Sequence, residues 1–213
     1  MGRTKLPFTA GSTIMISGPT SSGKTYWVKR LIKENMFTET IASVLYCYGV
    51  YQKSYEEFED NNKIQLHEGL PTLEQIQTLN DRKFHVIVID DLMESVICNK
   101  KMEELFTKLS HHYKCSTIFI TQNIFAQGSC SRNISLNSHV LVIFANKRDE
   151  SQANTLARQV FPNATKAFLE AYEDATNEAY GYLVVDCTPT TPRDFKLRTN
   201  IFPNEITYCY IPK

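Results

Sequence analysis

The sequence has no long hydrophobic run, and this absence argues against a membrane-spanning helix. No apolar stretch of the 213 residues approaches the ~20 residues that a helix needs to cross a bilayer. The opening stretch MGRTKLPFTAGS also lacks the apolar core of a secretory signal, so we expect the chain to stay where it is made. The hydrophobic share of 42% and the charged share of 22% are ordinary for a globular protein with one sizeable core.

An excess of charge of either sign is absent as well. Lys plus Arg number 23 and Asp plus Glu number 23, so the chain as a whole offers no basic field for nucleic acid. A motor that holds DNA through a few loops of a ring needs only a local basic patch, which this balance does not exclude. The eight arginines do not cluster, which disfavours a nucleotide kinase with an arginine-rich lid. The six cysteines form no CxxC pair, which favours buried free thiols in a reducing compartment over a zinc or redox site.

Apolar, β-branched runs alternate with stretches that suit helices. Several runs are almost continuously apolar, as strands covered on both faces must be. The pattern predicts an α/β fold with a doubly wound, mostly parallel sheet and helices on both faces, in a single domain 1–213 with its core at about 12–203 and a short tail at 204–213. The predicted strands are residues 13–17, 43–48, 85–90, 116–121, 139–145 and 181–186, with a last short strand near 206–211, and the predicted helices are 24–35, 73–79, 100–113, 150–161 and 163–172.

The stretch GPTSSGKT at residues 18–25 follows the first predicted strand and opens a helix, which is the context that predicts a P-loop. Backbone N–H groups and the helix N-terminus would face the phosphates there. Gly18 and Gly23 permit the tight turn, Lys24 would reach the β- and γ-phosphates, and the Thr25 hydroxyl would hold Mg²⁺. The residues expected to bind the nucleotide are Gly18, Pro19, Thr20, Ser21, Ser22, Gly23, Lys24, Thr25 and Tyr26.

Two acids and an amide follow the tips of the next apolar strands, at the edge where ligands bind in this architecture. In VIVIDD, Asp90 is expected to hold magnesium through its water shell, and Asp91 to orient and deprotonate the attacking water. A solvated helix cap is the alternative for Asp91. In IFITQN, Gln122 is expected to contact the γ-phosphate or the lytic water, with a polar turn at the strand end as the alternative.

The letters NKRD at residues 146–149 spell the NKxD pattern with which small GTPases read guanine. A GTPase also needs DxxG after its acidic strand, and this chain has DDLME there. The glycine is missing and no convincing SAK-like loop follows, so a P-loop GTPase switch remains the weaker alternative.

Together these motifs resemble those of the short genome-packaging ATPases of the FtsK/HerA superfamily, of the poxvirus type, found in large DNA viruses, virophages and Polinton-like or adintovirus elements. The resemblance covers about residues 12–203 and rests on SGPTSSGKTYWVKRLI, VIVIDDLM, STIFITQNIF, RNISLNSHVLVIFANKRDESQANTLARQVFP and YLVVDCTPTTPRDFKLRTNIFP. Within that family NKRD looks like a structural or subunit-contact element.

What the resemblance implies is a ring motor that uses ATP and Mg²⁺ to translocate viral double-stranded DNA, without sequence preference, into a preformed capsid. It implies a capsid or portal-like vertex protein as partner, and a place at assembly sites in the host cytoplasm or nucleus, or with the virion, with no membrane. A non-motor role in capsid assembly is a further alternative, although Lys24, Thr25, Asp90 and Asp91 are all intact.

Ring ATPases usually take an arginine from the adjacent subunit, which adds ~10³ to 10⁵ in rate. Arg132, in the polar loop GSCSRNISLNS, is the first candidate, followed by Arg148 and Arg198; a surface or intrasubunit ion pair is an equal alternative for each. Many members of the family carry Asp then Glu at the acidic strand, so the shorter Asp91 is expected to act through a second water or with help from Glu94.

Two loops are candidates for DNA contact. They are YGVYQKSY at residues 48–55 and the region of residues 99–101 after the acidic strand. Packing is the favoured interpretation of Tyr48, Tyr51 and Tyr55.

Overall fold

The structure is a computed structural model, and it describes residues 6–59, 61–79, 81–92, 114–125, 134–149 and 151–211. No helix in this part of the chain is long and apolar enough to cross a membrane.

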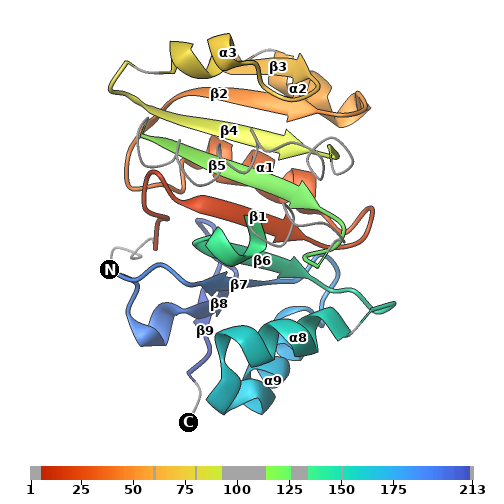
Figure 1. Ribbon diagram of the computed structural model, residues 1–213. Helices are drawn as coiled ribbons and strands as arrows, with labels where there is room; N and C mark the ends of the chain where they lie inside the picture. The colour runs from red at the N-terminus through yellow and green to blue at the C-terminus, as the bar shows by residue number, and fades with distance from the viewer. Residues whose placement is uncertain are drawn as a thin grey trace.

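The described strands form one sheet in the order β3-β2-β4-β5-β1-β6-β7-β8-β9 (Figure 1). The strands from β3 to β6 in this order run parallel, whereas β7, β8 and β9 are antiparallel to their neighbours, so the predicted α/β fold with a mostly parallel sheet is confirmed. The bounds are β1 Thr13–Ser17, β2 Ile41–Tyr48, β3 Ile64–Glu68, β4 Phe84–Asp90, β5 Cys115–Thr121, β6 Val140–Phe144, β7 Tyr182–Asp186, β8 Leu197–Thr199 and β9 Tyr208–Cys209.

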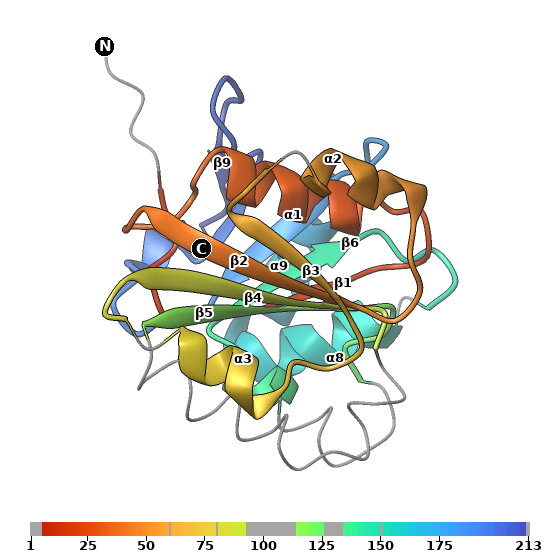
Figure 2. The same cartoon turned by 90° about the horizontal axis from the view of Figure 1, so that it is seen from above.

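Helices cover both faces of the sheet, and two apolar cores result. Figure 2 shows α1 and α2 on one face and α3 and α8 on the other. Alternate side chains of each strand point to opposite faces, so Ile16 packs in the core with Trp27 of α1, while Met15 packs in the other core with Leu156 of α8. The helices are α1 Lys24–Lys33, α2 Glu56–Glu59, α3 Leu73–Thr78, α8 Ser151–Val160 and α9 Thr165–Ala175, with short 3-10 turns η1 Lys53–Tyr55, η3 Pro162–Ala164 and η4 Arg193–Phe195.

The sequence patterns predicted the central strands of the sheet but not all of its shorter elements. β3, β8 and α2 were not predicted, and the last strand is confined to Tyr208–Cys209. β3 is only half-buried and contains Gln65 and His67, so it offers no continuous apolar run. The predicted helix 100–113 lies outside the described residues.

Candidate nucleotide-binding site

The predicted P-loop turns sharply out of β1 into α1, and its glycines are required by geometry. The N–H of Gly18 donates to the carbonyl of Thr121 on β5 at 3.3 Å. A Cβ added to Gly18 would lie 2.7 Å from Cβ of Phe144, and Gly23 has a φ of 99°, a conformation that L side chains rarely adopt. Larger residues at these two positions would therefore deform the loop.

The ammonium of Lys24 turns back over this loop. Its Nζ donates to the carbonyls of Gly18 and Pro19, at 2.7 Å each. Burial lowers the pKa of Lys24, and the nearby carboxylates of Asp90 and Asp91 act in the opposite direction. The partners of this cation within the loop are thus neutral carbonyls, which an anion can replace.

A second polar atom of the loop fits a bound anion. The hydroxyl of Ser22 is buried and has no hydrogen-bond partner among the described residues. Buried polar atoms are nearly always hydrogen-bonded, so this hydroxyl is suited to donate a hydrogen bond to an oxygen of a ligand. Together with the inward-turned Lys24, it shows that the loop suits a phosphate group.

The predicted metal residues meet at the end of β4. The Thr25 hydroxyl donates to Oδ2 of Asp90 at 3.3 Å, and Asp90 is 3% exposed. Burial raises the pKa of Asp90, while hydrogen bonds from the hydroxyls of Tyr46, Tyr55 and Thr25 oppose the rise. The described residues contain no cluster of three or more His, Cys, Asp or Glu. One hydroxyl and one carboxylate suit Mg²⁺, which takes its remaining ligands from phosphates and water.

One cavity of about 350 Å³ joins these groups. Because β5 lies between β1 and β4, Gln122 at the end of β5 lies between the P-loop and the acids. Asp91 is exposed and lines the same cavity. The lining residues are Thr20, Ser21, Ser22, Gly23, Lys24, Thr25, Tyr26, Gln52, Ser54, Asp90, Asp91, Ile120, Thr121, Gln122 and Tyr180. Gly18 and Pro19 do not line this cavity, and their carbonyls accept the hydrogen bonds of Lys24; their contact with nucleotide stays a prediction.

Five lining residues were not predicted as site residues: Ile120 and Thr121 belong to β5, next to the predicted Gln122, and the other three lie outside the predicted motifs. Gln52 and Ser54 belong to the segment after β2, and Tyr180 follows α9. Tyr180 has a φ of 63° and lies directly over the loop, because a Cβ on Gly23 would be 3.2 Å from its ring. No motif marks these three residues, since each comes from a connection that only the folded chain brings to the P-loop.

The sequence matches no protein-family model and none of the curated proteins. Solved structures, however, resemble the fold over nearly the whole chain. The genome packaging NTPase B204 from Sulfolobus turreted icosahedral virus 2, in complex with ATP-gammaS, has a TM-score of 0.60 at 11% identity, with 96% of this chain and 98% of that chain covered. The DNA-packaging ATPase B204 from Sulfolobus Turreted Icosahedral Virus has a TM-score of 0.58 at 13% identity, with 95% and 98% covered. A KaiC-like protein from Pyrococcus horikoshii OT3 has a TM-score of 0.50 at 15% identity, with 95% and 91% covered.

The fold is that of a P-loop NTPase.

The NKRD stretch at residues 146–149 forms hydrogen bonds within its own loop and with the start of α8. The side chain of Asn146 accepts the N–H of Arg148, and Asp149 accepts hydrogen bonds from Ser151 and Gln152 at the start of α8. These bonds lower the pKa of Asp149. None of residues 146–149 lines the cavity at the P-loop.

The candidate arginines separate into three cases. Arg198 is 2% exposed and its guanidinium bonds Asp186 at 2.8 Å, so the candidacy of Arg198 for a role across a subunit interface is wrong. Arg148 is exposed, and its side chain has no ion pair with any residue that the structure describes. Arg132, the first candidate, lies outside the described residues, as do Glu94 and residues 99–101.

Only part of the loop at residues 48–55, the candidate for DNA contact, is exposed at the surface. Tyr55 is buried and bonds Asp90, so the packing interpretation is confirmed for it. Tyr48 is half-buried and packs against Tyr55, with 5.4 Å between the ring centroids. Val50 and Tyr51 are exposed, at 66% and 45%.

A second cavity, of about 610 Å³, adjoins the first and shares Gly23, Tyr26 and Tyr180 with it. Tyr26 and Tyr180 are 66% and 70% exposed. Their uncovered rings therefore border both the phosphate loop and a neighbouring hollow large enough for a planar ligand group.

Proposed function

We propose that this protein is a Mg²⁺-dependent ATPase that translocates viral double-stranded DNA into a preformed capsid. The observation that carries the proposal is the single cavity bordered by Lys24, Thr25, Asp90, Asp91 and Gln122. Support for the packaging role comes from the likeness to the B204 genome-packaging NTPases, which extends over 96% of the chain. The earlier resemblance in motifs points to the same activity.

Each of these five residues has a chemical task in this proposal. Lys24 exchanges its carbonyl partners for phosphate oxygens and offsets their charge. Thr25 and Asp90 would hold Mg²⁺, and the metal would supply neutralisation of the phosphate charge. Asp91 is exposed to the water that would attack and accepts its proton, and Gln122 orients that water. Because Asp91 is one methylene shorter than Glu, the proton would pass to it through a second water or with help from Glu94, which lies outside the described residues.

We infer that the base is adenine and that it lies in the second cavity, against Tyr26 and Tyr180. Planar aromatic rings favour offset stacking with a purine. A guanine role for the NKRD stretch is disfavoured because Asn146 and Asp149 already accept hydrogen bonds within their own loop and helix. The GTPase switch therefore remains the weaker alternative.

The proposal also includes a ring of subunits, bound DNA and a capsid partner, which lie outside the nucleotide site. Completion of the site by an arginine of the next subunit, Arg132 or Arg148, would make hydrolysis depend on assembly. Val50 and Tyr51 are exposed in the segment whose Gln52 and Ser54 line the cavity. DNA bound near these exposed residues would be close enough to affect hydrolysis.

The experiment that tests the proposal is steady-state hydrolysis of ATP and of GTP, measured across protein concentration, with and without double-stranded DNA. We expect a preference for ATP, a rate that rises more than linearly with protein concentration, and stimulation by DNA. Lys24→Ala should abolish turnover, with Lys33→Ala, an exposed lysine at the other end of α1, as the matched control.

Two outcomes would contradict the proposal in different ways. A preference for GTP with slow turnover that ignores DNA would restore the guanine role of NKRD. Nucleotide binding without any hydrolysis, at all protein concentrations and with DNA present, would instead support a non-motor role in capsid assembly.

A further inference from the structure

Three hydroxyl groups converge on one oxygen of Asp90. Tyr46 donates to Oδ2 at 2.6 Å, Tyr55 donates to it at 3.0 Å, and Thr25 donates to it at 3.3 Å. Thr25 belongs to the nucleotide site itself, whereas the two tyrosines approach from β2 and η1, on the other side of β4. The tyrosine pair thus forms a second support for the carboxylate, independent of the P-loop.

The two tyrosines are fixed by packing, so their hydroxyls are aimed rather than merely near. Both side chains are fully buried, and their ring centroids are 5.2 Å apart. Phe58 joins this cluster of tilted rings, with its centroid 5.0 Å from that of Tyr46. Tyr46 is also held by the sheet, because its backbone pairs with Val88 of β4. Buried rings in one packed cluster have few alternative rotamers, so the hydroxyls retain their direction.

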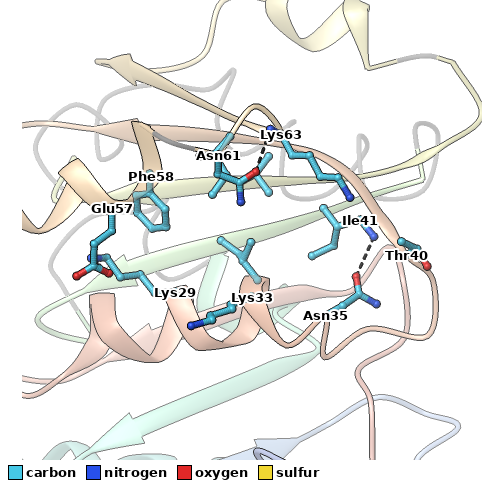
Figure 3. Close-up of a pocket in the computed structure, with 12 residues that line it drawn as sticks. Lys29, Lys33, Asn35, Thr40, Ile41, Glu57, Phe58, Asn61 and Lys63 are labelled. Atoms are coloured by element: carbon cyan, nitrogen blue, oxygen red, sulfur yellow. Dashed lines mark hydrogen bonds and ion pairs between the residues drawn. The ribbon is translucent and has the colours of Figure 1, made fainter.

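A lysine of α1 holds the segment that carries Tyr55. Figure 3 shows Lys29, Glu57 and Phe58 along a cavity between α1 and α2. The ammonium of Lys29 donates to the carbonyl of Ser54, forms an ion pair with Glu57 at 3.1 Å, and lies 5.1 Å from the centre of the Phe58 ring. The residue before Tyr55 is therefore tied to the helix that begins at the P-loop.

This arrangement has a consequence for metal binding. If the Thr25 hydroxyl were to bind Mg²⁺, Asp90 would keep two of the three donors that the described residues supply to its Oδ2, and a buried carboxylate with too few donors is costly to maintain. The tyrosine hydroxyls are not metal ligands and can stay on Oδ2. They would hold the carboxylate in place whether or not Thr25 stays bonded to it.

We propose that Tyr46 and Tyr55 are positioning residues that hold Asp90 for Mg²⁺ and so set the affinity of the nucleotide site for the metal. The inference rests on the proposed function, since it concerns the same site. Neither tyrosine touches the nucleotide in this account: neither lines the cavity at the P-loop. Loss of either hydroxyl should therefore raise the Mg²⁺ concentration that the site needs, and should leave the affinity for the nucleotide without metal nearly unchanged.

The test is binding of a fluorescent ATP analogue by anisotropy, first with EDTA and then across a Mg²⁺ titration. Tyr46→Phe and Tyr55→Phe remove one hydroxyl each and keep the ring. We expect the affinity in EDTA to stay within about twofold, and the Mg²⁺ concentration for half-maximal effect to rise about tenfold in each variant, the range for a hydrogen bond to a charged group. Because the two residues lie on different elements, either variant tests the inference if the other does not fold.

Two controls separate positioning from general structure. Tyr172→Phe removes a tyrosine hydroxyl that contacts the backbone of Phe144 and Asn146, away from Asp90, and should leave the Mg²⁺ titration unchanged. In an Asp90→Asn background, Tyr55→Phe should have no further effect on the titration, because the group through which it acts is gone.

The results distinguish this inference from the proposed function. If the wild type binds the analogue with a clear dependence on Mg²⁺ and both tyrosine variants titrate like it, the inference is wrong and the proposed function stands. An equal effect of Tyr55→Phe with and without the Asp90 carboxylate would also overturn it. If the wild type binds no ATP analogue, the proposed function fails, and the inference fails with it.

Discussion

At the scale of single residues, the proposed site for the base depends on Tyr180, a residue that no motif marks. Tyr180 is 70% exposed and borders both cavities. We expect Tyr180→Ala to weaken ATP binding about two- to tenfold, which corresponds to the loss of one aromatic stack. Affinity for inorganic triphosphate, which has no base, should not change. Competition against a fluorescent ATP analogue measures both, and Tyr180→Phe is the control that keeps the ring.

An equal loss of affinity for ATP and for triphosphate would contradict this assignment. It would show that Tyr180 supports the shape of the P-loop, which it also approaches through Gly23. The assignment of the base to the second cavity would then have no remaining aromatic anchor except Tyr26.

Residue identities in the P-loop were predictable because the motif is local. The GKT sequence and its place between strand and helix lie within one short stretch, where spacing alone fixes which groups face the phosphates. The bond from Tyr55 to Asp90 joins residues separated by 35 positions, and it exists only because η1 folds back onto β4. Such a contact depends on packing, and an aromatic residue in a loop carries no signal for it.

At the scale of elements, the start of α8 is tied to the segment after Gln122. The buried N–H of Ile124 donates to the side chain of Gln152 at 3.2 Å, and Gln152 in turn bonds Asp149 at 2.8 Å. We expect Gln152→Ala to lower the free energy of unfolding by about 1–3 kcal/mol, because the N–H of Ile124 loses its partner. Hydrolysis should fall as well, since Gln122 lies two residues away. Denaturant unfolding and turnover measure the two effects.

Gln159→Ala, which removes the same kind of side chain from an exposed position of α8, is the matched control for that variant. Normal turnover by a destabilised Gln152→Ala protein would show that this contact serves only the fold. It would also show that the position of Gln122 does not depend on this bond.

The beginning of β4 offers a test by pH. Asp81 accepts hydrogen bonds from His85, at 2.7 Å, and from the N–H of Lys83, which lower its pKa from 3.8 to about 2. Because folding lowers this pKa, the carboxylate stabilises the fold above its unfolded pKa, and the contribution is lost as the pH falls through about 2. The difference in melting temperature between wild type and Asp81→Asn should be full near neutral pH and vanish toward about pH 2. If the difference in melting temperature does not change with pH, the carboxylate of Asp81 does not stabilise the fold through its charge.

The strands of the sheet were predictable where they are buried on both faces, and not elsewhere. β4 and β5 are buried at every position, and each contains a run of three or more apolar residues that marks it in the sequence. β3 at the edge is half-buried, and β8 has only the three residues Leu197–Thr199, too few for a periodic pattern. The antiparallel direction of β7 follows from the connection through α8 and α9, which an apolar run does not encode.

At the scale of the whole molecule, we expect the buried ion pair of Arg198 and Asp186 to contribute to the stability of the fold and not to hydrolysis. It joins β8 to the end of β7, with both side chains nearly inaccessible. We expect Arg198→Met to lower the free energy of unfolding by about 3–5 kcal/mol, because it leaves a buried carboxylate without its partner. The folded fraction should hydrolyse ATP with the same dependence on protein concentration as the wild type. A loss of that dependence, in protein shown to be folded by its melting curve, would restore Arg198 as a residue that acts between subunits.

The assembly itself can be tested by mixing two inactive proteins. Lys24→Ala removes the cation that would bind the phosphates but leaves every arginine in place, while Arg132→Ala retains the whole described nucleotide cavity. If Arg132 completes the site of the adjacent subunit, mixed rings contain interfaces in which an intact P-loop faces an intact arginine. Mixing should then restore hydrolysis that neither protein shows alone, with a maximum at intermediate ratios. The same pairing with Arg148→Ala tests the second candidate, and a mixture that stays inactive at every ratio, although both proteins assemble, would show that the arginine in question does not act across the interface.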